Sequence, residues 1–357
     1  MLSKPAAVQE ANVHDLLRTA FAAGASDLHI NVGTEPLMRV HGKLIKAHDR
    51  VLGEARTEAM ARSILTDCQW QKLTDDGEVD LSFAIDGLCR FRVNAFRQRR
   101  VINMAFRLLM TSVPTIRQLK LPDIAFDFAA KQRGLVLVTG PTGSGKSTTL
   151  AAIINEINEK MSKHIITLED PIEYVHASKQ CLVVQREIGI DTHTFPSGLR
   201  AALRQDPDVI LVGELRDLET IRTAITAAET GHLVLGTLHT PDAPQTIDRI
   251  IDVFPTDQQR QIRVQLASVL IGVLSQRLIP RLDGTGRVMS LEVLINNAAV
   301  ANLIRQEKIY QIKSVIQTNR QLGMQAMSAS IKHWIASGTI HKDALKEYEL
   351  SVGEEMS

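Results

Sequence analysis

The chain has 357 residues, enough for two ordinary domains, and its 44% hydrophobic and 23% charged residues are typical of a soluble globular protein. Its 41 basic and 40 acidic residues leave a net charge of +1, so no overall field attracts nucleic acid or anionic lipid. The three cysteines form no CxxC pair, and no apolar run approaches the ~18 residues of a membrane span. These features exclude a zinc knuckle, a disulfide framework and a transmembrane protein. Residues 1–15 lack the apolar core of a signal peptide, which favours a cytoplasmic protein.

Residues 1–110 predict a small mixed α/β domain. Asn12 can cap a helix that ends at Gly24 and whose apolar face consists of Val13, Leu16, Leu17, Ala20 and Phe21. Further along, short strands are expected at 26–32, 36–46 (broken by His41-Gly42) and 101–109, with a helix near 54–65 and a hairpin over 79–96 that turns at Asp86-Gly87.

Residues 111–118 contain Pro114 and little periodicity, and we expect them to link this domain to a second one over 119–357. In the second domain, strands alternate with helices, and the strands are expected at 134–139, 164–170, 209–215 and 233–239. This alternation predicts an α/β fold with a parallel sheet and crossover helices. From about Thr256 onward the periodicity is mostly helical, and the apolar run 266–274 is interpreted as a core helix.

A phosphate-binding loop follows the first of these strands. The buried-strand pattern Gly134–Thr139 leads into Gly140, Pro141, Thr142, Gly143, Ser144, Gly145, Lys146 and Ser147, which fit G-x-x-x-x-G-K-[ST] in full. The glycines let backbone N–H groups point at phosphate oxygens, and the helix that begins near Lys146 adds its positive end. Lys146 is expected on the β- and γ-phosphates of ATP, Ser147 on Mg²⁺, and Thr148 beside them.

Acidic residues follow two other predicted strands. Glu214 ends the strand pattern DVILVGE, where P-loop ATPases place an acid that reaches Mg²⁺ or the attacking water. Gly213 replaces the more usual aspartate, which makes Glu214 the candidate for orienting water; a surface cap on the strand is the alternative. Glu169, Asp170 and Glu173 follow the strand in ITLEDPIEY and can supply Mg²⁺ and water contacts, with Glu169 and Asp170 as the metal ligands. A solvated acidic loop is the other interpretation.

Two histidines flank the last predicted strand, in TGHLVLGTLHT. Next to a γ-phosphate site, His232 and His239 suggest a sensor of phosphate occupancy, whereas a lone histidine is as often structural. A metal-ligand role has less support, because no cysteine or third histidine lies at metal-binding spacing.

Six arginines occupy one predicted strand pair of the first domain: Arg90, Arg92, Arg97, Arg99, Arg100 and Arg107. They can form a solvated strand face, a nucleic-acid surface, or arginine fingers that stabilise charge on a phosphoryl group. From the residues alone the solvated face is favoured, since the net charge is near zero and few aromatics are interleaved.

Four segments in this order resemble the boxes of the secretion-superfamily ATPases, most closely the PilT-type type IV pilus retraction ATPases: GPTGSGKST, ITLEDPIEY, ILVGELRDLETI and TGHLVLGTLHT. The resemblance implies a PAS-like N-terminal domain, a RecA-like P-loop ATPase domain and a homohexameric ring. It implies that Arg92, Arg99 and Arg107 approach the nucleotide, that Glu214 and Glu173 are the hydrolysis glutamates, and that His232 and His239 are the paired histidines.

The same resemblance implies a motor that uses ATP and Mg²⁺ to retract the pilus in twitching motility. Its partners would be an inner-membrane platform protein and possibly a paralogous retraction ATPase, with no nucleic acid, and it would lie at the inner face of the cytoplasmic membrane. Pilus assembly and type II secretion ATPases carry an extra N-terminal domain and often a four-cysteine motif, which are not seen here. A nucleic-acid-translocating P-loop hexamer is the alternative from another class.

One segment departs from the PilT-type pattern. The family motif near AIRNLIRE corresponds here to AVANLIRQ at 299–306, so that Ala301 replaces an arginine and Gln306 a glutamate. Both changes remove charge. The departure keeps open an accessory retraction motor similar to PilU.

Overall fold

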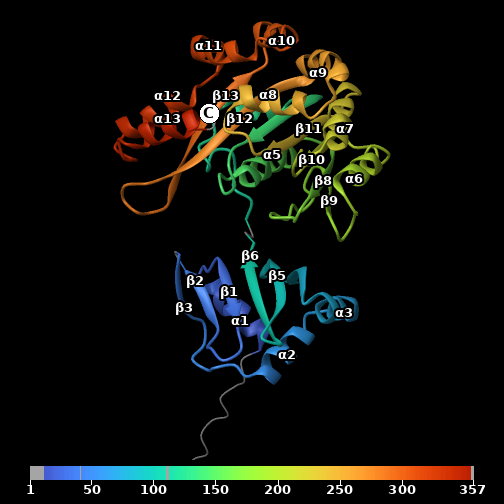
Figure 1. Cartoon of the computed structure of the whole chain (residues 1–357), viewed down its shortest axis with the longest axis vertical. Helices are drawn as coiled ribbons and strands as arrows, with labels where there is room; N and C mark the ends of the chain where they lie inside the picture. The colour runs from blue at the N-terminus through green and yellow to red at the C-terminus, as the bar shows by residue number, and fades with distance from the viewer. Residues whose placement is uncertain (1–11, 41, 110–111, 355–357) are drawn as a thin grey trace, which may run out of the picture. The chain divides into compact units, whose positions relative to one another are not determined.

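The computed structural model describes residues 12–40, 42–109 and 112–354, with side chains up to residue 350 (Figure 1). The chain divides into two compact units, Met1–Ser112 and Val113–Ser357, and each is described by itself. His41, part of the predicted break in 36–46, and Thr111, at the start of the predicted linker, lie outside the described residues.

The described part of the first unit is an antiparallel sheet with three helices. The strand order is β3-β2-β1-β6-β5-β4. The strands are β1 Asp27–Ile30, β2 Leu37–Val40, β3 Lys43–Lys46, β4 Glu78–Ile85, β5 Cys89–Gln98 and β6 Val101–Leu108. The helices are α1 Val13–Ala22, α2 Glu54–Arg62 and α3 Asp67–Asp76. The sequence predicted the strands, α1 and α2 but missed α3, although Thr66 and Gln69 form a capping box there.

Helix α1 follows the prediction except at Phe21. The Asn12 side chain accepts a hydrogen bond from the Asp15 N–H, and the residues at i, i+3, i+4 and i+7 are buried (Val13, Leu16, Leu17 and Ala20). Phe21 was expected on this face, but it is 36% exposed. The position i+8 lies about 80° round the helix from Val13, at the rim of the apolar stripe.

The second unit is built on a mostly parallel sheet of order β13-β12-β7-β11-β10-β8-β9. Its strands are β7 Gly134–Thr139, β8 His164–Glu169, β9 Leu182–Glu187, β10 Val209–Val212, β11 Leu233–Leu238, β12 Leu270–Pro280 and β13 Arg287–Ile295. Within the described sheet, only β13 pairs antiparallel, against β12. The predicted α/β fold is confirmed, and the carboxyl ends of β7, β8, β10 and β11 meet at one edge.

Helices cover both faces of this sheet. They are α4 Ile124–Ala129, α5 Lys146–Lys160, α6 Phe195–Ala202, α7 Leu218–Glu229, α8 Ala243–Asp252, α9 Thr256–Val269, α10 Ala298–Arg305, α11 Ile312–Thr318, α12 Met327–Ala336 and α13 Ala344–Glu354, with short 3-10 turns at Ile309–Gln311 and Arg320–Leu322. Leu135 and Leu137 of β7 pack in one core with α7–α10, whereas Val136 and Val138 pack in another with α4 and α5. This division follows from the alternation of side chains along a strand.

The prediction of a core helix over 266–274 is wrong, because α9 ends at Val269 and Leu270 begins β12. The expected helical C-terminal region accordingly contains the β12–β13 hairpin. A short apolar run does not distinguish a buried strand from a buried helix. Tertiary packing decides here: a Cβ on Gly272 would collide with the Leu294 carbonyl oxygen of β13 and the Phe128 ring of α4.

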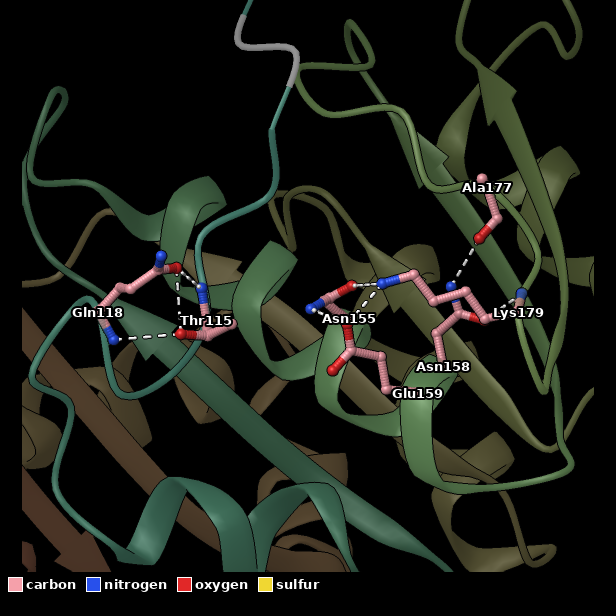
Figure 2. A network of polar contacts seen from close by, with 7 residues as sticks. All are labelled: Thr115, Gln118, Asn155, Asn158, Glu159, Ala177 and Lys179. Atoms are coloured by element: carbon pink, nitrogen blue, oxygen red, sulfur yellow. Dashed lines mark hydrogen bonds and ion pairs between the residues drawn. The ribbon is translucent and has the colours of Figure 1, made fainter.

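Most of the predicted linker 111–118 belongs to the second unit. Thr115 N–H donates to the Gln118 Oε1 at 2.8 Å, and Gln118 N–H donates to the Thr115 Oγ1 at 3.2 Å (Figure 2). Between them, Ile116 is 1% exposed and packs in the core that contains α4 and α5. These reciprocal bonds and the buried isoleucine give the segment a fixed local structure.

A buried acidic pair joins β13 to the start of α8. Glu292 is 5% exposed, and its Oε1 accepts a hydrogen bond from the Ala243 N–H at 2.8 Å. The neighbouring Asp242 carboxylate lies 3.0 Å from the Lys313 ammonium. Burial, and secondarily the Asp242 charge, raise the pKa of Glu292 to about 7.

This raised pKa predicts that Glu292 makes stability depend on pH. The folded chain holds the Glu292 proton more tightly than the unfolded chain, so the contribution is full below about pH 4.5 and is lost as the pH rises through about 7. Glu292→Gln keeps an acceptor for Ala243 N–H without the charge. We expect urea unfolding from pH 5 to 8 to show the variant gaining up to about 3 kcal/mol relative to wild type. Glu347→Gln, at an exposed site, should leave the profile unchanged; parallel profiles for wild type and Glu292→Gln would contradict the prediction.

Candidate active site

The phosphate-binding loop connects β7 to α5 at the carboxyl edge of the sheet. Gly143 and Gly145 have φ of 76° and 89°, in the left-handed region that favours glycine. A Cβ on Gly140 would collide with the carbonyl oxygen of Gln276 in β12. The loop is therefore fixed by glycine at its beginning and at its end, and its backbone N–H groups lead into the first turn of α5.

Gln276 supports this loop from β12, and the sequence analysis missed it. Its side chain is fully buried, its Nε2 donates to the Ser144 carbonyl at 2.7 Å, and its Oε1 accepts from the Thr149 hydroxyl at 3.0 Å. One amide thus joins the loop to the helix that follows. The only signal in the sequence is a polar Ser275-Gln276 pair that interrupts an apolar run.

Lys146, His239 and Glu214 form a chain of polar contacts at this edge. Lys146 is 9% exposed, and its ammonium donates to the carbonyls of Gly140 at 2.8 Å and Pro141 at 3.1 Å. His239 Nδ1 lies 3.4 Å from the Lys146 Nζ, and its Nε2 lies 3.4 Å from the Glu214 Oε1. The three side chains come from α5 and from the residues after β11 and β10, as the parallel topology requires.

The charges in this chain compensate one another. Burial lowers the pKa of Lys146, while the carboxylates of Glu214 and Glu173 raise it in part. Burial and the Lys146 charge lower the pKa of His239, so its imidazole is neutral at neutral pH. Glu214 also pairs with Arg216, with 2.5 Å between Oε1 and Nε. A neutral imidazole between an ammonium and a carboxylate can change its hydrogen bonds when a phosphoryl group binds next to Lys146.

The three acids at and just after the end of β8 differ in their surroundings. Glu169 Oε1 accepts from the Thr167 hydroxyl at 2.6 Å and from the Gln185 amide at 3.0 Å, and burial raises its pKa. Asp170 and Glu173 are exposed. Over the described chain, no three His, Cys, Asp or Glu side chains gather into a metal site.

Comparison with known proteins identifies the family of this chain. The sequence model of the type II/IV secretion system protein family matches residues 3–346. The chain belongs to this family. It is 47% identical to the type IV pilus retraction ATPase PilT of Pseudomonas aeruginosa, over 94% of this chain and 97% of that protein. It is 40% identical to the type IV pilus ATPase PilU of the same organism, over 92% of this chain and 87% of that protein. A crystal structure of the pilus retraction motor PilT with bound ADP has a TM-score of 0.90 and 45% identity, and the match covers 95% of this chain and 97% of that one.

His232, the other histidine of the family pair, lies away from this cluster. It precedes β11, whereas His239 follows it, so about 20 Å of strand separates the two residues. Its Nδ1 lies 2.9 Å from the Ala227 carbonyl and 3.2 Å from the Thr230 hydroxyl. Within this chain, His239 alone of the pair lies at the phosphate-binding edge.

The three family arginines are divided between two places in the first unit. Arg92 and Arg107 are direct partners on β5 and β6, and the Arg107 Nε lies 3.0 Å from the Asp27 carboxylate. Arg99 lies in the turn between these strands, with φ of 51°. Six residues of β5, about 20 Å of strand, lie between it and Arg92. The first unit brings Arg92 and Arg107 together but not Arg99.

The segment that departs from the PilT-type motif forms α10. Ala301 is 8% exposed and packs in the core that α7–α10 share, so the position of the family arginine is a buried one here. Gln306 caps the end of the helix and donates to the Asn302 side chain at 3.3 Å. The two changed positions therefore have different surroundings.

Among the helices that the structure describes, none combines the length and the apolar composition of a membrane span.

The separation of the two histidines leads to a paired prediction. His239→Gln should lower the ratio of ATP to ADP affinity about tenfold, because His239 lies beside the lysine that reaches the γ-phosphate and one lost hydrogen bond is worth about 1.4 kcal/mol. His232→Gln should leave that ratio unchanged. Calorimetric titration with ATP and ADP measures both, and an equal fall in the two variants would contradict the assignment.

Proposed function

We propose that this chain forms a homohexameric motor whose ATP hydrolysis powers type IV pilus retraction. The enzyme is an ATPase of the type II/IV secretion system family. The observation that carries the proposal is the Lys146–His239–Glu214 chain at the phosphate-binding loop, in a chain that matches PilT over almost its whole length. The same similarity to PilT supports the proposal that ATP hydrolysis by this chain drives the disassembly of pilin filaments, and hence twitching motility.

In the proposed reaction, the loop N–H groups and Lys146 hold the phosphates of ATP. Ser147 and Asp170 would hold Mg²⁺, which would supply charge neutralisation for the phosphates. Glu214, just after the end of β10, orients the attacking water and accepts its proton; its carboxylate pairs with Arg216, and it would share that contact with the water. Glu173, in the neighbouring loop, is the second hydrolysis glutamate. His239 acts as a sensor of the γ-phosphate through its contact with Lys146. Glu169, which is buried and already bound by Thr167 and Gln185, is less suited to Mg²⁺ than the exposed Asp170.

Arg92, Arg99 and Arg107 are proposed to approach the nucleotide of the same or a neighbouring subunit, and His232 to act across a subunit boundary. Arg92 is exposed, whereas Arg107 would have to exchange its Asp27 partner for phosphate. Contacts that exist only with ATP bound would favour one arrangement of the domains, and hydrolysis would release it. This differential binding is how a ring of such subunits converts hydrolysis into movement.

The proposed partners are further copies of this chain, an inner-membrane platform protein and possibly a paralogous retraction ATPase, at the inner face of the cytoplasmic membrane. The balanced charge gives no support to nucleic acid as the substrate. An accessory retraction motor similar to PilU is the second candidate, and Ala301 in α10 and Gln306 at the C-cap of that helix favour it.

Replacing Glu214 tests the hydrolysis site. Glu214→Gln should lower kcat at least a hundredfold, since the group that accepts the proton is lost, and should leave ATP affinity within about twofold. Phosphate release and ATP titration measure the two quantities. Glu219→Gln, on the exposed first turn of α7, is the matched control and should hydrolyse ATP normally. Normal turnover in Glu214→Gln would refute the assignment.

Deleting the gene tests the direction of the motor. Many surface pili on cells that lack surface motility are expected, because pili would be built but not retracted. Electron microscopy and a motility assay measure this. Cells without pili would indicate an assembly motor, and normal pili with normal motility would favour the accessory function.

A further inference from the structure

The segment between β8 and β9 comes after the phosphate-binding helix α5 in the chain. It contacts both the first turn and the second half of this helix. Near the start of α5, the Tyr174 hydroxyl lies 2.9 Å from the Thr148 hydroxyl, and Tyr174 is 7% exposed. Thr148 comes two residues after Lys146. The acid-bearing loop is thus hydrogen-bonded directly to the first turn of the helix that binds phosphate.

The other end of the segment is bound to the second half of α5 (Figure 2). Asn158 is 1% exposed; its Nδ2 donates to the Ala177 carbonyl at 2.8 Å, and its Oδ1 accepts from the Lys179 N–H at 3.0 Å. The Lys179 ammonium donates to the Asn155 Oδ1 at 2.9 Å and the Glu159 Oε1 at 2.5 Å. We refer to residues 172–179 as the strap.

Gln185 of β9 holds the strap close to the acids. Its Nε2 donates to the Glu169 Oε1 at 3.0 Å and to the Tyr174 carbonyl at 2.9 Å, and its Oε1 accepts from the His176 N–H at 2.8 Å. A single half-buried amide thus joins an acid at the end of β8 to the backbone on the far side of Glu173. It uses both its donor group and its acceptor, which restricts its rotamer.

Glu173 lies between two immobilised neighbours. Ile172 and Tyr174 are 3% and 7% exposed, whereas Glu173 is exposed. The Ile172 N–H donates to the Glu187 carboxylate at 3.4 Å, and the Tyr174 carbonyl accepts from Gln185. With both neighbours turned inward and bound to β9, the Glu173 side chain projects outward, and its charge acts on Lys146.

We propose that Gln185 and Tyr174 are positioning residues for hydrolysis, which fix Glu173 relative to Lys146 without contacting the nucleotide themselves. The proposal rests on the proposed ATPase function of this site. Gln185 holds the backbone just after Glu173 through Tyr174 and His176 and ties it to the Glu169 side chain at the end of β8. Tyr174 sets the distance of the strap from the first turn of α5. Lys179 and Asn158 hold only the far end of the strap and have no such effect on Glu173.

The main experiment compares two full-length variants, one in β9 and one in the strap, each of which loses side-chain hydrogen bonds to or from the strap. Gln185→Met should speed hydrogen–deuterium exchange across residues 170–177 and lower kcat about tenfold, with the ADP affinity within twofold. Lys179→Met should speed exchange only near 177–181 and leave kcat within twofold. Equal losses of kcat in the two variants, or normal kcat in Gln185→Met despite faster exchange, would overturn the proposal.

A double-mutant cycle tests whether Gln185 acts through Glu173. On a Glu173→Gln background, Gln185→Met should lower kcat less than twofold further, because the group that it positions is already gone. A full tenfold additional loss would overturn the proposal.

Tyr174→Phe removes only one hydroxyl and replaces the main experiment if Gln185→Met does not fold. It should lower kcat about threefold with an unchanged thermal midpoint. An unchanged kcat would contradict the positioning role of Tyr174.

Failure of the positioning proposal is distinguishable from failure of the proposed function. If wild type hydrolyses ATP and Glu214→Gln does not, the ATPase assignment stands whatever the strap variants show. The exchange rates of residues 170–177 are measured without nucleotide, so they report the hold of Gln185 on the strap independently of turnover.

Discussion

The active site depends on the close approach of the phosphate-binding loop to strand β12. Gly140 lies against the Gln276 carbonyl with no room for a side chain, and the Gln276 amide binds Ser144 and Thr149. The loop, the helix after it and the strand beside it therefore form one rigid unit. Because β7 lies between β12 and β11, the same packing that fixes the loop also sets where His239 follows β11.

Electrostatic balance at Lys146 follows from this placement. A lysine that is 9% exposed loses hydration, and the Gly140 and Pro141 carbonyls and nearby carboxylates compensate for the loss. Glu214 and Glu173 provide that compensation from the ends of two other strands. The same carboxylates are the candidates for handling water, so the groups that keep the lysine charged are also the groups that the reaction needs. His239 lies between lysine and glutamate and connects the two functions.

The sequence predicted those parts of the site whose chemistry is local. The strand Gly134–Thr139, the glycine-rich loop and Glu214 are each defined by adjacent residues, so pattern alone located them. The prediction of a helix over 266–274 is wrong, and the role of Gln276 was missed. Both depend on contacts between residues far apart in the sequence: Gln276 and Ser144, for example, are 132 positions apart. The sequence also grouped His232 with His239, since spacing along a strand does not show which edge of the sheet each residue reaches.

Two glutamines from strands without any motif hold the two functional loops. Gln276 of β12 holds the phosphate-binding loop, and Gln185 of β9 holds the loop that carries Glu169 and Glu173. In each case one side-chain amide both donates and accepts hydrogen bonds and so joins two segments, which a carboxylate or an apolar side chain cannot do in this way. Motif residues share in this holding, since Lys146 donates to the Gly140 carbonyl and Tyr174 of ITLEDPIEY contacts Thr148. The two glutamines, however, bind only other parts of the chain, so no ligand-binding pattern in the sequence marks them.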